Sequence, residues 1–342
     1  MDFNEATRGT TTMNKVLSLS NLTTLAATLC LCLAGSQAMA KDWRGWNIHP
    51  PTYPNSIALE NFVSLAAQLT DGEVTGEVYH NATLGNQADA ISQMQLGSID
   101  FANFNLGPLG TTVPAANVVS LPFIFKDIDH MHRVMDGEFG DKLSAAMAEE
   151  GIISLAWYDS GARSFYNSER AINTPSDVEG LKFRVMNNEL FVGMVEALGG
   201  NASPMAFSEV YQSLKTGVVD GAENNWPSYE STNHYEVAQF YSDTGHLILP
   251  ECVCVSKQVW DGLSAVNQES LQIAARASAD LQRRLWAQRA AASRQAVLDA
   301  GIQFNTIADK AAFQNAMAPV YAAAIEETPV LEELINDIQS VE

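Results

Sequence analysis

Apolar and polar residues follow two different periods along the first half of the chain. Short apolar runs with strand character lie at 42–47, 77–80 and near 103–105, and helical spacing of apolar residues occurs at 56–69 and 89–96. The run at 152–157 is almost uniformly apolar, as is typical of a strand that is buried on both faces. Strands and helices that alternate in this way form the repeating unit of an open parallel sheet. The pattern therefore predicts an α/β fold.

The second half of the chain continues the alternation. We predict strands at 181–185, 218–222, 245–250, 253–256 and 302–306, and helices at 188–198 and 209–214, the latter capped by Ser208. Ser264 then caps a helix whose apolar side includes Leu271, Ala274 and Ala277. If this helix is unbroken to residue 298, it measures roughly 50 Å. One lobe cannot cover that length, so we expect the helix to span two lobes.

The predicted mature chain is too long for one small core. About 300 residues favour two lobes, each with a central mixed sheet flanked by helices. We expect lobe 1 to comprise 41–160 plus about 249–285, and lobe 2 to comprise 161–248 plus about 286–342. No Gly/Ser-rich linker separates these segments. The chain should therefore cross between the lobes several times.

Residues 1–40 have the pattern of a signal peptide. Lys15 precedes an apolar run at 22–34 that is too short to span a bilayer, and Ala38-Met-Ala40 has the small residues of a cleavage site. Met13 is an alternative start. No later apolar run reaches the length of a membrane helix. We therefore expect cleavage before Lys41 and export, most simply to a bacterial periplasm.

The charge balance restricts the partners. The chain carries 40 acidic and 19 basic residues, a formal net charge of −21, and such a protein repels nucleic acid and anionic lipid. It also lacks a P-loop, a G-x-S-x-G elbow, a G-x-G-x-x-G turn and an H-E-x-x-H pair. We therefore predict no nucleic-acid partner, cofactor, metal site or catalytic residue.

Two of the four cysteines lie beyond the signal peptide, at Cys252 and Cys254. Two residues at i and i+2 on one strand point to the same side but are poorly placed for a disulfide. We therefore interpret both as small buried hydrophobes. Half of a metal site is the weaker alternative, because no partner ligands are evident.

The candidate binding chemistry lies at 161–227. Arg184 ends a short apolar run, Arg163 follows Gly161-Ala, and Asn224 follows a predicted strand. A guanidinium binds a carboxylate through two parallel hydrogen bonds, which lysine cannot reproduce. Our hypothesis is that Arg184 anchors a ligand carboxylate, assisted by Arg163 and Asn224. The alternative is an ordinary ion pair on the surface or between the lobes.

Several short motifs in a fixed order resemble the DctP-type solute-binding proteins of TRAP transporters, the tripartite ATP-independent periplasmic systems. The motifs are Leu84-Gly85, Leu121-Pro-Phe123, Gly161-Ala-Arg163, Gly180-Leu-Lys-Phe-Arg184 and Gly217-Val-Val-Asp-Gly221-Ala-Glu-Asn224. The resemblance implies a two-lobe, type II-like periplasmic binding protein fold. It also implies a ligand carboxylate on Arg184, with Arg163 and Asn224 assisting, and delivery to the small and large subunits of a membrane permease.

Further motifs resemble the branch of this family that binds hexuronates such as glucuronate or galacturonate. They are His49-Pro and Tyr53-Pro54, the run from Trp157 to Tyr166, and Glu223-Asn-Asn-x-Pro227. A uronate also needs partners for its hydroxyl groups. The polar candidates are His49, Gln87, Asn105, Asn188 and Asn225. Tyr158 and Trp226 are the aromatic candidates for the apolar face of a sugar.

Three other functions remain open at this point. The same fold can bind a different organic acid, such as a C4-dicarboxylate, an aldonate or an aromatic acid. It can serve as the sensory subunit of a receptor, or as a periplasmic enzyme that acts on sugar acids. The enzyme needs a base, nucleophile or metal in the cleft, and none is evident in the sequence.

Overall fold

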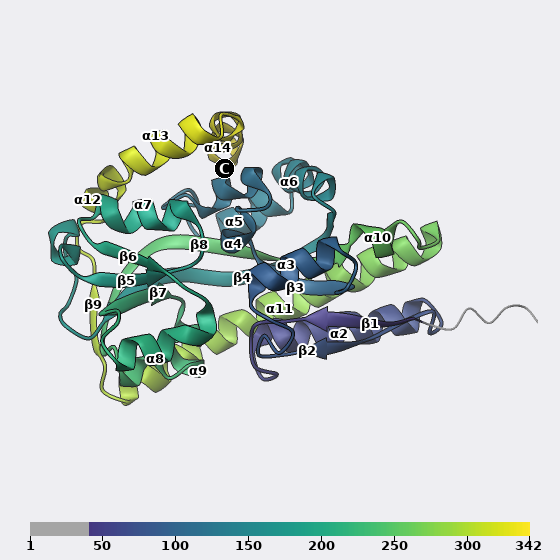
Figure 1. The fold of residues 1–342 in the computed structure, drawn as a ribbon, viewed down its shortest axis with the longest axis horizontal. Helices are drawn as coiled ribbons and strands as arrows, with labels where there is room; N and C mark the ends of the chain where they lie inside the picture. Colours follow the sequence, from purple (N-terminus) through teal and green to yellow (C-terminus); the bar gives the residue numbers. More distant parts are fainter. Residues whose placement is uncertain (1–40) are drawn as a thin grey trace, which may run out of the picture. The chain divides into compact units, whose positions relative to one another are not determined.

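One mixed sheet of nine strands organises Lys41–Glu342, the residues that the computed structural model describes (Figure 1). The strand order is β2-β1-β3-β8-β4-β7-β5-β6, with β9 paired to β8. Pairs near both ends of this order are parallel, whereas β3/β8, β8/β4 and β4/β7 are antiparallel. The predicted signal peptide, 1–40, lies outside the described residues.

Two strands are much longer than the others. β4 spans Ile152–Asn167 and β8 spans Phe240–Ser256, and they pair over most of their lengths. The remaining strands are β1 Lys41–Trp46, β2 Val74–Tyr79, β3 Phe101–Asn105, β5 Lys182–Val185, β6 Asn201–Pro204, β7 Gly221–Asn224 and β9 Gln303–Thr306. The prediction that β4 ends at 157 and that β8 is broken is therefore wrong. β4 and β8 are each one continuous strand, and all the strands belong to a single sheet.

Register shifts explain why β4 does not end where the sequence indicates. Its pairing with β8 slips between Ser154 and Ala156, between Asp159 and Ala162, and again before Phe165. Gly161 lies in the second of these irregularities with φ +59°, and a Cβ there would lie 2.7 Å from Nε1 of Trp286. Glycine therefore lets the strand bend without losing its partner.

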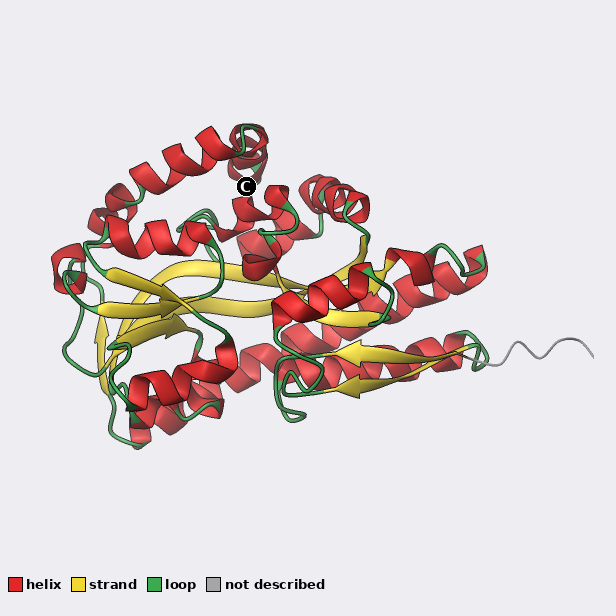
Figure 2. Ribbon diagram, viewed as in Figure 1, coloured by secondary structure: helices red, strands yellow, loops and turns green. Residues whose placement is uncertain are grey.

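Helices cover both faces of the sheet (Figure 2). The main ones are α2 Pro54–Leu69, α3 Gln87–Gln95, α5 Ile128–Met135, α6 Glu138–Glu149, α7 Glu189–Ala197, α8 Val210–Lys215, α9 Trp226–Ser231, α11 Ala265–Asp299, α12 Lys310–Ala316, α13 Ala318–Glu327 and α14 Val330–Ser340. Two four-residue helices, α4 Leu106–Leu109 and α10 Lys257–Trp260, follow β3 and β8.

Polar side chains fix where several helices begin. Asn86 caps α3 in a reciprocal arrangement with Asp89, and Ser264 accepts a hydrogen bond from the backbone of Asn267 at the start of α11. Ser208 does not cap the helix that follows it, because α8 begins at Val210 and Glu209 occupies the capping position. Ser208 instead lies on the wall of a cavity.

The long helix packs against clusters at both ends of the sheet. Leu271 and Ala274 belong to a hydrophobic cluster with α2, β1 and β3, and Val297 belongs to another with α8 and α9. The prediction of one long, unbroken helix is confirmed. The assignment of residue ranges to two lobes stays a prediction, since Lys41–Glu342 forms one unit by its internal contacts.

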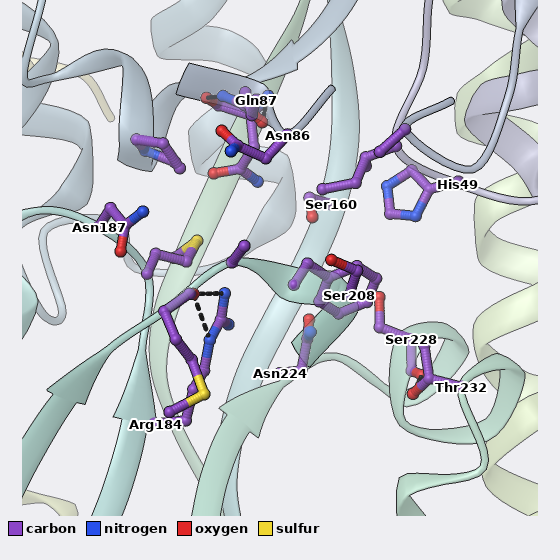
Figure 3. Close-up of a pocket in the computed structure, with 18 of the residues that line it drawn as sticks. His49, Asn86, Gln87, Ser160, Arg184, Asn187, Ser208, Asn224, Ser228 and Thr232 are labelled. Atoms are coloured by element: carbon purple, nitrogen blue, oxygen red, sulfur yellow. Dashed lines mark hydrogen bonds between the residues drawn. The ribbon is translucent and has the colours of Figure 1, made fainter. Parts of the chain in front are cut away.

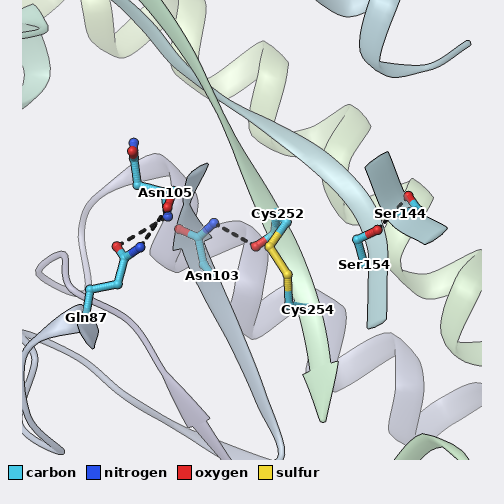
Figure 4. Close-up of a disulfide and its surroundings, with 7 residues drawn as sticks. All are labelled: Gln87, Asn103, Asn105, Ser144, Ser154, Cys252 and Cys254. Atoms are coloured by element: carbon cyan, nitrogen blue, oxygen red, sulfur yellow. Dashed lines mark hydrogen bonds between the residues drawn. A yellow bond between two sulfur atoms is a disulfide. The ribbon is translucent and has the colours of Figure 1, made fainter. Parts of the chain in front are cut away.

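The structure corrects the interpretation of the cysteines. Cys252 and Cys254 form a disulfide, with their Cα atoms 5.5 Å apart (Figure 4). This separation lies in the range that a disulfide requires. The register shift between Ser154 and Ala156 lies across from these residues, and their Cα separation is shorter than two residues of a regular strand span. An ideal extended strand, which the sequence argument assumed, would hold them further apart.

No helix of Lys41–Glu342 combines the length and the apolar character that crossing a membrane requires.

Candidate functional site

A cavity of about 390 Å³ lies where several strands end (Figure 3). His49 follows β1, Asn105 ends β3, Arg184 lies in β5 and Asn224 ends β7. All four line the cavity, as do Gln87 and Arg163. The carboxyl ends of strands are the usual place for ligands in sheets of this kind. The volume is near the lower end for small-molecule sites, which hold roughly 300–1,000 Å³.

Arg163 is committed to the protein itself. Its Nε and Nη2 donate to the two carboxylate oxygens of Glu223 at 2.6 and 2.7 Å, and Nη1 donates to Oδ1 of Asn224 at 2.7 Å. Burial raises the pKa of Glu223, but the charge of Arg163 and nearby His246 outweigh it and hold that pKa at about 2. The positive charge of Arg163 is therefore balanced before any ligand arrives.

Arg184 is buried without such a partner. Its Nε and Nη2 donate to the backbone carbonyl of Met205 at 3.0 and 2.7 Å, as the dashed lines in Figure 3 mark. Within 41–342 no carboxylate forms an ion pair with it, and its Nη1 has no hydrogen-bond acceptor. Burial lowers the pKa of Arg184 to about 10, so the group is still a cation at neutral pH. A buried cation with free donors in a cavity is a site for an anion.

The other wall of the cavity carries polar groups and one carboxylate. Figure 3 places His49, Asn86 and Gln87 across the space from Arg184. Glu251 also lines the cavity and accepts from Nδ2 of Asn105 at 3.1 Å. The side chain of Gln87 bonds to the backbone of Asn105, whose orientation it fixes (Figure 4).

His234 adds an aromatic polar group beside Arg184. Its Nδ1 lies 2.8 Å from the hydroxyl of Tyr166, and its ring meets that of Phe207 edge-on. Burial, together with the charge of Arg184, lowers the pKa of His234 to about 3, so the imidazole is neutral. Ser228 and Thr232 also line the cavity (Figure 3).

Two of the predicted site residues make their contacts away from the cavity. The hydroxyl of Tyr158 bonds to Ser278 of α11 at 2.8 Å, and its ring belongs to the hydrophobic cluster there. Asn225 caps α9, and its amide donates to the backbone carbonyl of Ser160 at 2.8 Å. Neither lines the cavity.

The other two lie apart from the cavity wall as well. Asn188 caps α7, and its amide bridges to the carbonyl of Gly107 at 2.8 Å and to Asn117 at 2.7 Å. The ring of Trp226 stacks on Tyr241 with centroids 3.7 Å apart. Asn188 and Trp226 therefore make contacts within the fold, and the structure does not bring them together with Arg184 at the cavity.

Sequence reasoning missed several lining residues, among them Glu251, His234, Asn187, Ser208 and Thr232. Glu251 left a usable signal. It stands alone as a charge in the apolar run from Leu247 to Val255, and a buried charge requires a specific partner. The other residues lie in segments without a distinctive pattern.

Comparison with known families identifies the chain. Residues 47–328 match the DctP model, described as bacterial extracellular solute-binding protein, family 7. The chain belongs to the DctP family. The resemblance inferred from the short motifs is thereby confirmed, and the fold agrees with it.

Solved structures similar to this DctP chain contain uronates. A TRAP periplasmic solute-binding protein from Roseobacter denitrificans, with bound β-D-glucuronate, is 60% identical, covers 88% of this chain and 100% of its own, and has a TM-score of 0.87. One from Chromohalobacter salexigens, with bound D-glucuronate, is 57% identical with the same coverage and TM-score. One from Sulfitobacter sp. NAS-14.1, with bound β-D-galacturonate, is 57% identical, covers 87% and 99%, and has a TM-score of 0.86.

Proposed function

We propose that this DctP-family chain is the periplasmic receptor of a TRAP transporter and that it captures a hexuronate, glucuronate or galacturonate. The observation that carries the proposal is the state of Arg184. It is a buried cation that donates, within residues 41–342, only to the carbonyl of Met205, and its remaining donors face a cavity of sugar size. A ligand carboxylate supplies the missing counter-charge.

The cavity also offers partners for the rest of a uronate. Asn224 uses its Oδ1 for Arg163, which orients its amide nitrogen as a donor at the cavity wall. Asn105, His49, Ser228 and neutral His234 are further hydrogen-bonding groups. The three similar structures described above contain glucuronate or galacturonate, which supports the same class of ligand here. The proposed carboxylate site therefore comprises Arg184 with the support of Arg163 and Asn224.

The position of the cavity supports a receptor function. Its lining comes from segments at both ends of the sheet, such as His49 after β1 and Arg184 in β5. A ligand that contacts both groups favours an arrangement in which they approach each other. In this proposal the loaded protein is recognised by the small and large permease subunits, the chain is exported behind a cleaved signal peptide, and it performs no catalysis.

Isothermal titration calorimetry tests the ligand class. The purified chain from Lys41 onward is titrated with D-glucuronate, D-galacturonate, D-glucose and succinate. We expect binding of a uronate and none of D-glucose, which has the same ring without the carboxylate. Tight binding of succinate without binding of either uronate would reject the hexuronate proposal and favour a C4-dicarboxylate receptor.

Long incubation of the protein with the bound ligand separates a receptor from an enzyme. Ligand recovered unchanged would support a receptor, and its conversion would support an enzyme.

A further inference from the structure

Glu251 is an unusual element of an anion-binding cavity. Within Lys41–Glu342 it is the one acidic side chain on the cavity wall, and it is only 2% exposed. Its neighbours are amides: Nδ2 of Asn55 donates to Oε2 at 2.7 Å, and Nδ2 of Asn105 donates to Oε1 at 3.1 Å. No lysine or arginine of the described chain pairs with it. The carboxylate is therefore held by neutral donors and keeps its negative charge.

The ionisation of Glu251 agrees with this geometry. Burial raises the pKa of its carboxyl group, but nearby His49 and the amides of Asn105 and Asn55 outweigh burial and hold the pKa below its usual range. Glu251 is thus a carboxylate at neutral pH. A carboxylate accepts hydrogen bonds and cannot donate them.

His49 lies next to this carboxylate with an unused nitrogen. Its Nε2 is buried without a hydrogen-bond partner and lies 3.8 Å from Oε1 of Glu251, too far for a direct hydrogen bond. The imidazole is held in place because it stacks on Tyr53, with ring centroids 3.9 Å apart and planes 8° from parallel. Tyr53 is in turn fixed by a hydrogen bond of 2.8 Å to Ser228. A buried polar atom of this kind implies that a partner is supplied from outside the chain.

One ligand hydroxyl satisfies both groups. An oxygen about 2.8 Å from each atom can span a separation of 3.8 Å, donating its proton to Oε1 of Glu251 while it accepts from Nε2 of His49. A second carboxylate cannot do so, because it has no proton to donate and carries the same charge as Glu251.

We propose that Glu251 and His49 form the specificity-determining end of the cavity: together they bind a hydroxyl group of a monocarboxylate sugar acid and exclude acids with a second carboxylate. This inference rests on the proposed function, since it assumes that the first carboxylate lies on Arg184. The cavity is then polarised, with an arginine that forms no ion pair on one wall and a carboxylate that pairs with no lysine or arginine of the described chain on the other. Such an arrangement selects both the class of ligand and its orientation.

The test compares two acids on two proteins. D-Glucuronate and D-glucarate differ at one end, where glucarate carries a second carboxylate, and both are titrated by calorimetry into the wild-type chain and Glu251→Gln. We expect the wild type to prefer glucuronate. The substitution should weaken the binding of glucuronate roughly 10- to 100-fold, the usual effect of losing a hydrogen bond to a charged group. It should also reduce the ratio of the affinity for glucuronate to the affinity for glucarate at least about tenfold. Because this ratio is compared between the two proteins, the effect of the different shapes of the two acids cancels.

A matched control is available at Glu60, whose exposed carboxylate lies 2.8 Å from Nε2 of His80. Glu60→Gln changes the same chemical pair outside the cavity and should alter neither affinity nor ratio. If Glu251→Gln fails to fold, His49→Asn decides the question, because it leaves the carboxylate in place. We expect it to weaken the binding of glucuronate about 5- to 50-fold, while the free protein, which loses the stacking on Tyr53, still unfolds in one cooperative thermal transition.

The outcomes separate this inference from the proposed function. If the wild type binds neither uronate, the proposed function fails and the inference fails with it. If the wild type binds glucuronate but Glu251→Gln keeps the affinity and the ratio, the inference alone is overturned. A wild type that binds glucarate as tightly as glucuronate also overturns it.

Discussion

Replacing each buried arginine by methionine should have opposite effects on the free protein. Methionine has a similar length without charge or donors. In the unliganded protein Arg163 neutralises Glu223, whereas Arg184 has only the carbonyl of Met205. Arg163→Met leaves a buried carboxylate without its main partner. Arg184→Met removes a buried cation that lacks a counter-charge.

The structure gives the size of each effect. Burial lowers the pKa of Arg184 from 12.5 to about 10, which corresponds to roughly 3 kcal/mol of unfavourable free energy in the folded state. Removing Arg184 relieves this unfavourable free energy but also loses the hydrogen bonds to Met205, which cancels about 1–3 kcal/mol of the gain. Arg184→Met should therefore leave the Tm of the free protein unchanged or higher. Breaking the pair with Glu223 costs about 3–5 kcal/mol, so Arg163→Met should lower the Tm by roughly 5–15 °C.

Ligand binding gives the second half of this prediction. Two hydrogen bonds from Arg184 to a carboxylate, at about 1.5–3 kcal/mol each, correspond to roughly a 10²- to 10⁴-fold loss of affinity in Arg184→Met. Arg184→Lys should be nearly as damaging, because one ammonium group cannot reproduce the fork. Thermal denaturation with and without saturating D-glucuronate, combined with calorimetry, measures both quantities. Arg184 is not an anion site of this kind if Arg184→Met destabilises the free protein as much as Arg163→Met, or if Arg184→Lys binds D-glucuronate with wild-type affinity.

Three further predictions follow from the contacts around the site. The free energy of unfolding in urea should fall as the pH drops from about 6.5 toward 3, because His234 (folded pKa about 3) is protonated in the unfolded state first, and it should fall further between about 4.5 and 2 because Glu223 has a folded pKa of about 2. His234→Asn should flatten the change between pH 6.5 and 4.5, and an unchanged pH profile would contradict the role given to His234. The mass of the mature chain should rise by two hydrogens on reduction, since Cys252 and Cys254 are bonded; free thiols in the denatured, unreduced protein would contradict this. Trp226→Leu should lower the free energy of unfolding by about 1–3 kcal/mol because its stacking on Tyr241 is lost, but it should leave the uronate Kd within about threefold. A much larger loss of affinity would show that Trp226 contacts the ligand after all.

The strongest candidate was visible in the sequence because its signal is local. Arg184 ends the run Leu181-Lys-Phe-Arg, and an apolar strand that ends in arginine delivers the side chain to the sheet's carboxyl edge. The bounds of most elements were also predictable, since capping residues such as Ser264 mark them. Both inferences use residues within a few positions of each other.

The long-range pairing could not be predicted in the same way. Arg163 and Glu223 are 60 positions apart, and only the antiparallel register of β4 and β7 places them together. The three register shifts in β4 also defeat simple alternation, so the side to which Tyr158 points cannot be counted from its neighbours.

The long helix illustrates a further limit. The predicted apolar side includes Ala277, which the structure exposes, whereas polar Ser278 and Gln282 are buried. Gln282 is acceptable there because its amide accepts from the backbone nitrogen of Asp159 at 2.8 Å and donates to Asn55 at 2.7 Å. A hydrophobic pattern cannot identify a polar residue whose partners come from other elements.

A crystal structure of the chain from Lys41 onward with D-glucuronate would show directly whether Arg184 binds the ligand carboxylate. We expect the ligand carboxylate within about 3 Å of the terminal nitrogens of Arg184, and a sugar hydroxyl between Glu251 and His49. A complex in which the carboxylate is bound elsewhere, with Arg184 still bonded only to the carbonyl of Met205, would contradict this expectation.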